Sequence, residues 1–598
     1  MRNTDPKKYS CIVRGLSEAK LNDLQTFRRA SNNTNWYNKF LHFFIIFFFL
    51  AIASEGAVRS GSYPNSIEEV LKLDNDKIDL ASSVLLVSKR WNNQFNSNYY
   101  INFIDRIAQE VREKAGPNAS NSKICETINS VLFTKMGFKA IDSADNPDDL
   151  FLNTVIDNKR GYCLSLSILY LCIGEKLDLP LYGVVAPGHF FVRCDDGGNS
   201  FNIETTQMGG SAPDSHYIEK FNIPDNASQG VYLRNLTKKE TIGCLFNNLA
   251  NVYMNKEQIE YAFYYQKLSV ALTPMLAEAR TNLGNIYLRK NMTDLAIQQY
   301  ENALEINPQD AKTHHNLGNA YRKKGIFDAA IKQYNIALKL DPNYVEIYKG
   351  LAWAYHSKGI DEKAIVYLKT AADINSRDPD IYIALAGIYR DRKNWDAAIS
   401  NYRRALIVKT DSVDAAYGLG YVFFQKEMYY EALEQYRTAV YYQPLNANAH
   451  MGLALVYEKL NWPEEEIQSY KNAINADPNF AGAYQNLANI YMERKQYDLA
   501  ASNYETAVKL SPKDADLYFN LGVSNSAREL YEPAKEYYLK TIELKWNFPA
   551  AHNNLAVTLY SLGKYEQALN HAKIAKQQGY DVSEDFLNQL TKLVENKR

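Results

Sequence analysis

The sequence has few cysteines and almost no net charge, and each shortage excludes a class of protein. Its 598 residues contain six cysteines, with no Cys-x-x-Cys pair and no Cys/His metal pattern. A structural zinc site is therefore not expected, and no cofactor is predicted. Lysine and arginine total 67 against 68 aspartates and glutamates. Because no overall positive field attracts a polyanion, nucleic acid is not expected as a partner.

One apolar run stands out near the N-terminus. Residues 40–53 (FLHFFIIFFFLAIA) follow a basic segment, residues 1–39, which has eight lysines and arginines against three acidic residues. Fourteen residues are short for a membrane span and suit a signal-peptide core, with small residues before Ser54 as a cleavage site. The long basic segment instead favours an uncleaved anchor. We expect residues 40–54 to be a signal peptide or a transmembrane anchor helix, with the bulk of the chain exported or membrane-anchored outside the cytoplasm.

The C-terminal part of the chain repeats itself every 34 residues. A leucine recurs at this interval without insertion, and alanine stands thirteen residues later in every unit except one, where Glu466 replaces it. The leucines are Leu249, Leu283, Leu317, Leu351, Leu385, Leu419, Leu453, Leu487, Leu521 and Leu555. A unit of this length cannot bury its own apolar face, so neighbouring units must stack into a solenoid with one continuous surface. Such a surface predicts binding of other molecules.

This repeat frame resembles the tetratricopeptide repeat. Gly or Ala follows the leucine, an aromatic residue usually stands four residues on, and most units have alanine at twenty and proline at twenty-five. The resemblance covers residues 239–580 as ten units and implies an all-α right-handed superhelix with two antiparallel helices per unit. Residues 581–598 are expected to form a capping helix with a polar face.

Asparagine often precedes the frame leucine. In this repeat family that position faces the concave groove, where stacked amides can pair with the backbone of an extended peptide. The candidate peptide-binding residues are Asn248, Asn282, Asn316, Asn486, Asn520 and Asn554. Because asparagine is common there in any protein of the family, a purely structural role is the alternative.

Two further features modify this predicted groove. Asparagines two residues beyond the leucine extend the ladder at both ends, namely Asn251, Asn285, Asn319 and Asn489. In the middle of the array, small residues and rings replace the amides, namely Gly350, Trp353, Ala384, Gly387, Gly418 and Tyr421. We expect a bulkier or apolar part of a ligand to lodge there.

Residues 66–235 do not show the pattern of the 34-residue repeats. Amphipathic helical patterns come first, in residues 66–73, 79–91 and 100–114. An apolar helix follows, and after it come short β-rich runs that Pro-Gly and Asp-Asp-Gly-Gly-Asn turns separate. This order predicts an α+β domain with its helices first and its sheet after.

This domain contains a cysteine, a histidine and an acid or amide in the order along the chain that is typical of a cysteine nucleophile site. Cys163 is expected in the first turn of the apolar helix, where free amides and the helix dipole favour a thiolate. His189 opens the second β run and could act as the base. Asn202 and Glu204 project from one face of the third run, and either could hold the imidazole in the required tautomer.

The stretch from Gly161 to Cys194, followed by FNIETT, resembles the transglutaminase-like superfamily with its papain-type core. The resemblance covers most of residues 66–210 and implies Cys163 as nucleophile and His189 as base. Glu204 stands where the acid of the family is usually aspartate. One extra methylene moves a carboxylate by about 1.5 Å, so Asn202 remains an alternative.

Three functions are compatible with this organisation. In the first, the repeats bind protein or peptide partners as a scaffold, and Cys163 and His189 are core residues of an inert domain. In the second, the chain is a tethered cysteine-dependent peptidase or acyl transferase that uses Cys163, His189 and Glu204 on a peptide held by the repeats. The third is a structural export or assembly factor. We predict the scaffold, because ten units in register are a stronger signal than three residues.

Overall fold

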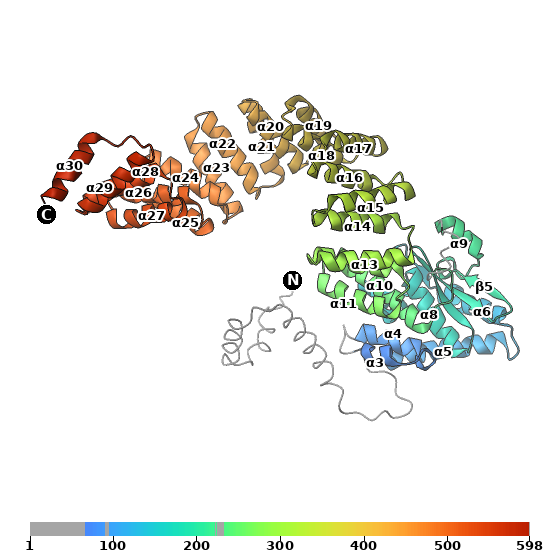
Figure 1. Ribbon diagram of the computed structural model, residues 1–598. Coiled ribbons are helices and arrows are strands. Elements are labelled where there is room, and N and C mark those ends of the chain that lie inside the picture. The colour runs from blue at the N-terminus through green and yellow to red at the C-terminus, as the bar shows by residue number, and fades with distance from the viewer. Residues whose placement is uncertain (1–65, 90–94, 222, 224–231, 597–598) are drawn as a thin grey trace, which may run out of the picture.

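The computed structural model describes residues 66–89, 95–221, 223 and 232–596. The expected signal or anchor segment, residues 40–54, lies outside these ranges. Within them a domain of helices and strands leads into a long, curved run of helical hairpins (Figure 1). No helix in these ranges is long and apolar enough to cross a membrane.

The first domain surrounds one buried helix. Its leading elements are α3 (Ile67–Lys72), η2 (Asn75–Lys77), α4 (Leu80–Lys89), α5 (Ser97–Ala115), α6 (Asn121–Asn129) and the π-helical turn η3 (Ser130–Lys135). After them come β1 (Lys139–Ala140), η4 (Pro147–Leu150), α7 (Leu152–Asn158), β2 (Arg160–Gly161) and α8 (Cys163–Lys176). Every α8 residue from Cys163 to Gly174 is buried, because the helix is apolar on all sides and neighbouring elements pack around it.

A three-stranded antiparallel sheet packs against α8. Its strands are β3 (Leu181–Ala186), β4 (His189–Asp195) and β5 (Ser200–Ile203), in that order across the sheet. The two-residue turn between β3 and β4 contains Gly188 at φ 69°, a left-handed conformation that glycine adopts without strain. This turn pairs Ala186 with His189 and so places the histidine at the start of β4. The chain continues through η5 (Thr205–Gln207) and α9 (Asp214–Phe221).

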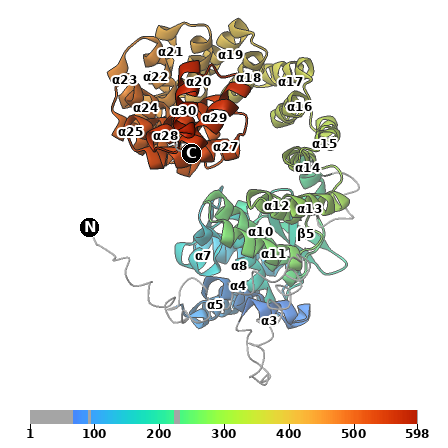
Figure 2. The same ribbon diagram turned by 60° about the vertical axis from the view of Figure 1, so that its left-hand side comes forward.

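Ten antiparallel hairpins follow and confirm the predicted repeat architecture. Their helices are α10 (Lys238–Asn255), α11 (Ile259–Leu272), α12 (Ala277–Arg289), α13 (Thr293–Ile306), α14 (Ala311–Lys323), α15 (Phe327–Leu340), α16 (Val345–Ser357), α17 (Asp361–Ile374), α18 (Pro379–Asp391), α19 (Trp395–Val408), α20 (Val413–Gln425), α21 (Tyr429–Tyr442), α22 (Ala447–Lys459), α23 (Pro463–Ala476), α24 (Ala481–Glu493), α25 (Tyr497–Leu510), α26 (Ala515–Ala527), α27 (Tyr531–Leu544), α28 (Pro549–Ser561) and α29 (Tyr565–Gln577). Helix α30 (Glu584–Glu595) packs on α29 at the end. Figure 2 shows the hairpins from α18 onward winding around a common axis.

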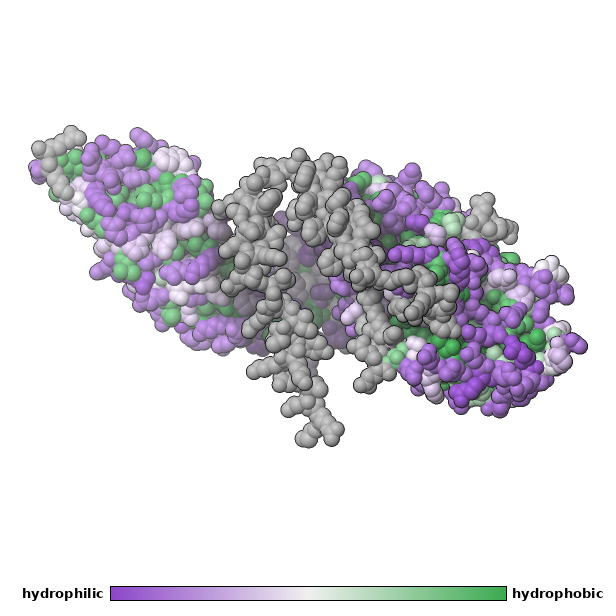
Figure 3. Space-filling view, turned by 90° about the horizontal axis from the view of Figure 1, so that it is seen from below, coloured by the Kyte–Doolittle hydropathy of each residue, from purple (hydrophilic) through white to green (hydrophobic). Residues whose placement is uncertain are grey.

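Polar side chains dominate the face of the molecule seen from below (Figure 3). Figure 3 shows one face on which hydrophilic residues predominate and hydrophobic residues form small groups. The apolar side chains instead fill the seams between helices, where the alanines thirteen residues after each leucine are wholly buried at Ala262, Ala296, Ala330, Ala364, Ala398, Ala432, Ala500, Ala534 and Ala568. Small residues at these positions let the helices cross closely.

The first hairpin shares a hydrophobic core with the α/β domain. One continuous cluster contains Leu169 of α8, Phe190 of β4 and Phe246 of α10, and it extends to Ile286 of α12. Helix α10 also contacts η4, α8 and β3 directly. The array is therefore built onto the domain through a common core, with α10 belonging to both.

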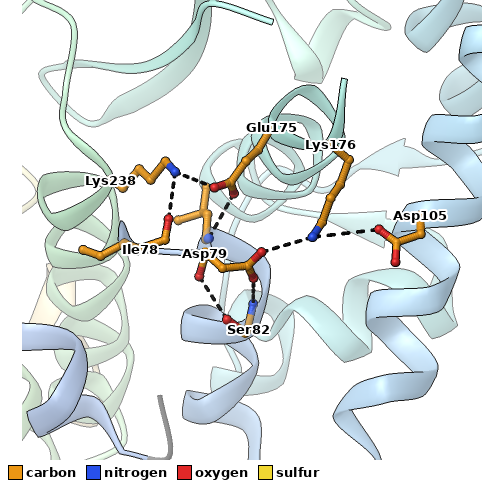
Figure 4. A network of polar contacts seen from close by, with 8 residues as sticks. Ile78, Asp79, Ser82, Asp105, Glu175, Lys176 and Lys238 are labelled. Atoms are coloured by element: carbon orange, nitrogen blue, oxygen red, sulfur yellow. Dashed lines mark hydrogen bonds and ion pairs between the residues drawn. The ribbon is translucent and has the colours of Figure 1, made fainter. Parts of the chain in front are cut away.

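A network of polar contacts reinforces this joint. Lys238, the first residue of α10, forms an ion pair with Glu175 of α8 and donates to the carbonyl oxygen of Ile78 at 2.7 Å (Figure 4). The next residue of α8, Lys176, pairs with Asp79 at 3.1 Å. Such partly exposed pairs add little stability each, but together they fix how α10 lies against α8 and α4.

We expect Glu466→Ala to stabilise the array. Glu466 is 9% exposed at a position that is alanine in the other nine units, and removing a charged carboxylate from water is unfavourable. Burial, with Glu458 and Glu493 nearby, raises the pKa of Glu466 from 4.5 to about 7. As pH rises through this window, the unfolded carboxyl ionises before the folded one, so the native protein loses stability. The gain from the substitution should grow from pH 4.5 to 7, measured as unfolding midpoints.

The neighbouring exposed residue offers a matched control, because Glu465→Ala removes a carboxylate from the same helix turn at the surface. That variant should change the unfolding midpoint little at either pH. An unchanged midpoint in Glu466→Ala across the whole pH range would contradict the cost assigned to this buried carboxyl.

Candidate functional site

Cys163 is the first residue of α8, and local contacts fix the turn before it. The backbone amide of Tyr162 donates to the Ser165 hydroxyl at 2.9 Å, and that hydroxyl donates to the carbonyl oxygen of Asp149 at 2.9 Å. Cys163 itself is 4% exposed. Its thiol therefore lies at the N-terminal end of a buried helix, where the positive end of the dipole favours an anion.

His189 and Glu204 form a direct pair. The His189 Nε2 atom lies 2.9 Å and 3.1 Å from the two carboxylate oxygens of Glu204. Glu204, which is 4% exposed, also accepts from the Tyr217 hydroxyl at 2.7 Å and the Thr206 hydroxyl at 3.0 Å. Although burial acts in the other direction, these bonds and His189 lower the pKa of the Glu204 carboxyl. The carboxylate is thus held ionised against the ring.

The charge on His189 depends on both of its neighbours. Burial lowers the pKa of His189, but hydrogen bonding to the Cys163 thiol and to Glu204 outweighs it and raises the pKa to about 9. The ring is therefore protonated at neutral pH, and an imidazolium beside a thiol stabilises its thiolate. The structure places Cys163 beside His189 and His189 against Glu204, and the catalytic roles expected for them stay a prediction.

Asn202, the alternative to Glu204, does not reach the histidine. Its Oδ1 accepts from Arg193 Nε at 2.8 Å, and its Nδ2 donates to the carbonyl oxygen of Ala212 at 2.9 Å and to Asp214 at 2.8 Å. These bonds hold the chain that enters α9. Glu204 alone orients the ring, and its longer side chain meets the histidine at hydrogen-bond distance.

A cavity of about 360 Å³ lies beside Cys163 and His189. The α/β domain supplies one side of it, and the first two hairpins supply the other through residues of α10, of α12 and of the turn before α12, namely Cys244, Asn247, Asn248, Asn251, Leu276, Glu278 and Asn282. The candidate site and the beginning of the repeat groove therefore open into the same space. The sequence period does not predict this junction, because the cavity depends on how α10 packs against α8.

The predicted groove asparagines are half-buried and partly engaged. Asn282 donates to Asn247 at 3.0 Å, Asn316 to Asn285 at 3.1 Å and Asn486 to the Tyr470 hydroxyl at 3.3 Å. Asn248 donates to a backbone carbonyl of its own helix at 3.0 Å, and Asn520 and Asn554 are half-buried as well. Each of these bonds uses one amide hydrogen, so the primary amides retain hydrogen-bonding capacity.

The asparagines two residues beyond the leucine have a structural role instead. Asn285, Asn319 and Asn489 each accept a hydrogen bond from a tyrosine of the same hairpin, at 2.7, 2.7 and 2.5 Å. These bonds hold the tyrosine between the two helices. Their Oδ1 atoms have partners while their Nδ2 atoms can still donate, so the expected extension of the ladder stays a prediction.

The expected space in the middle of the array is also largely filled. A Cβ atom at Gly350 would lie 2.7 Å from the Tyr334 ring, and one at Gly418 would lie 2.4 Å from the Tyr402 ring. Glycine is needed there because the tyrosine of the preceding hairpin occupies the volume. At Gly387 no atom lies within 4 Å of the corresponding point, and Trp353 and Tyr421 nearby in the repeat frame are 47% and 37% exposed.

Comparison with protein families gives the same division of the chain. A model of the transglutaminase-like superfamily matches residues 98–233, and tetratricopeptide-repeat models match segments between residues 284 and 570. The chain joins a transglutaminase-like domain to a tetratricopeptide-repeat array. The repeat matches begin in the second hairpin, at residue 284. The first hairpin shares a hydrophobic core with the α/β domain.

Similar proteins cover one part or the other. A UPF0162 protein of Xylella fastidiosa is 24% identical over 217 residues, 35% of this chain and 76% of the relative. The UPF0162 protein YchA of Escherichia coli K12 is 24% identical over 212 residues, 33% and 76% of the two chains. Human F-box only protein 21 is 27% identical over 158 residues, 25% of this chain and 23% of that protein.

Solved structures that match are tetratricopeptide-repeat proteins. YrrB, described as having an unusual peptide-binding site, is 26% identical, with 31% of this chain and 95% of YrrB covered and a TM-score of 0.28. PilF of Pseudomonas aeruginosa is 20% identical, with 34% and 91% covered and a TM-score of 0.31.

Cys163 is expected to react with iodoacetamide at neutral pH. The reason is the neighbouring His189, whose pKa of about 9 keeps it protonated there. His189→Gln should lower the rate at pH 7 by about tenfold or more, because the thiolate loses its counter-ion. Peptide mapping by mass spectrometry would locate the label, and Cys163→Ala would show whether the buried Cys125, Cys172, Cys194 and Cys244 add to it. Equal rates in the wild type and His189→Gln would contradict this arrangement.

Proposed function

We propose that the protein is an interaction scaffold whose repeat groove binds an extended segment of a protein partner. The repeats themselves support a general role in protein interaction. The half-buried primary amides of Asn282, Asn316 and Asn486 carry the finer proposal, because they retain donors and acceptors that match a peptide backbone. Backbone pairing of this kind tolerates many sequences.

A second function, cysteine chemistry on the bound segment, is favoured by one observation. The cavity beside Cys163 and His189 is walled by Asn248 and Asn282 of the groove. A segment that lies along the first hairpins can therefore place a carbonyl group near the thiol. In this proposal the array delivers the substrate and the α/β domain acts on it.

The chemistry proposed at this cavity is acyl transfer. The Cys163 thiolate attacks a carbonyl carbon, a C–S bond forms, and the C–N bond breaks as the leaving amine takes the proton from His189. Water or an amine then attacks the thioester, gives its proton to His189 and releases the thiolate. Glu204 holds the ring throughout as a positioning residue, and no oxidant or reductant is consumed.

We propose further that residues 40–54 direct the folded part of the chain out of the cytoplasm. The apolar run and the basic residues before it support this. N-terminal sequencing of the protein from the exported fraction would test it. A new N-terminus at Ser54 would indicate cleavage, an intact N-terminus in the membrane fraction would indicate an anchor, and recovery from the cytoplasm alone would contradict the proposal.

Replacing Asn282, Asn316, Asn486 and Asn520 together by alanine should weaken partner capture in a pull-down by about tenfold or more, since each lost hydrogen bond contributes about 0.5–1.5 kcal/mol. The unfolding midpoint should change little. Asn401→Ala with Asn503→Ala is the control, because these asparagines lie on second helices of their hairpins and bond to their own backbone. Unchanged capture by the groove variant would remove the amides from the proposal.

A further inference from the structure

One carboxyl oxygen in the cavity lacks a hydrogen-bond partner in the described part of the chain. Glu278 is the second residue of α12 and lines the cavity together with Cys163 and His189. Its Oε2 atom is inaccessible to solvent and has no hydrogen-bond partner among the described residues. Four other units also have an acid at this position, namely Glu346, Asp380, Asp414 and Asp516, and the remaining five do not, so an acid is common there without being required by the repeat frame.

The surroundings of Glu278 differ from those of Glu204, the other carboxyl close to this cavity. Glu204 accepts hydrogen bonds from His189, Tyr217 and Thr206. Burial raises the pKa of Glu278 to about 7; its own backbone amide opposes this shift, and Asp310 adds to it. An ionised carboxylate with one oxygen out of contact with water and no counter-ion beside it is unfavourable, and a ligand cation would reduce that cost.

We propose that Glu278 binds a cationic nitrogen group, an ammonium or guanidinium, on the segment whose carbonyl reaches Cys163. This inference rests on the cysteine chemistry proposed above and adds the class of substrate. Glu278 thereby becomes a specificity-determining residue that the repeat array contributes to the site of the other domain.

The composition of the cavity supports a cation over other ligands. Its described lining contains no lysine or arginine, and its one histidine is already paired with Glu204. Around Glu278 the array presents the amides of Asn247, Asn251 and Asn282, whose oxygens can accept from an ammonium group. A volume of about 360 Å³ is small for a ligand site, so the cation must stand close to the reacting carbonyl. A lysine or arginine side chain and a free N-terminal amine both meet this description.

Thiol reagents of different charge test the proposal on the full-length protein. Cys163 is treated at about pH 8, where Glu278 is ionised, with methyl, 2-aminoethyl and 2-sulfonatoethyl methanethiosulfonate, which are neutral, cationic and anionic. Each forms a mixed disulfide and releases methanesulfinate. The cationic reagent should react about tenfold or more faster than the anionic one, because an ionised carboxylate in the same cavity attracts a cation and repels an anion. Glu278→Gln should remove most of that ratio.

Glu305→Gln, which removes an exposed carboxylate from α13, the second helix of the same hairpin, is the matched control and should leave the ratio unchanged. The same ratio in Glu278→Gln and the wild type would overturn the proposal. Failure of Cys163 to react even with the neutral reagent would instead count against the cysteine chemistry.

If Cys163 does not react even with the neutral reagent, a binding measurement decides the role of Glu278, because binding does not need a reactive thiol. In the Cys163→Ala protein, N-acetyl-Gly-Lys-Gly-amide should bind about fivefold or more tighter than its norleucine counterpart by ligand-observed NMR. The binding of Gly-Gly-Gly-amide, which has a free N-terminal amine, is compared with the binding of its N-acetylated form. This comparison tests whether an N-terminal amine can be the bound cation. Loss of the preference in Glu278→Gln supports the proposal, and the absence of any preference for either cation overturns it.

Discussion

The hydrophobic core shared by α8 and α10 is the contact on which the rest of the molecule depends. Leu169 and Phe246 lie in one cluster, and the ion pair between Lys238 and Glu175 closes its edge. Because α8 also carries Cys163 at its first turn, the same packing fixes the thiol relative to the first groove helix. A flexible link between the domains would leave a groove and a cysteine as two separate features, whereas the shared core makes one cavity of them.

The parts of the structure that depend on local pattern could be predicted from the sequence. Ten helical hairpins follow from the interval of 34 residues, because stacking is the only way for such units to bury their apolar faces. The start of α8 at Cys163 and the position of His189 after a Pro-Gly turn follow from equally local signals. Even the exception at Glu466 could be recognised, since it breaks an otherwise regular series of buried alanines.

The parts of the structure that depend on contacts between distant segments could not be predicted from the sequence. The sequence places Asn202 and Glu204 on one strand face, but β5 ends at Ile203. Asn202 binds Arg193 and Asp214, and Glu204 is left to the histidine. Gly350 leaves no open space, because a tyrosine from the preceding hairpin fills it. Glu278 is an ordinary surface acid in sequence and becomes part of a cavity only through the packing of the first hairpins on the α/β domain.

Native-state hydrogen exchange on the full chain tests the shared core most directly. If α8 and α10 belong to one cooperative unit, their slowest amides should report the same opening free energy. Phe246→Ala, which empties a buried position of α10, should lower that free energy in both helices by about 3–5 kcal/mol. Exchange in α10 that follows the later hairpins, with α8 unaffected by the substitution, would contradict the account.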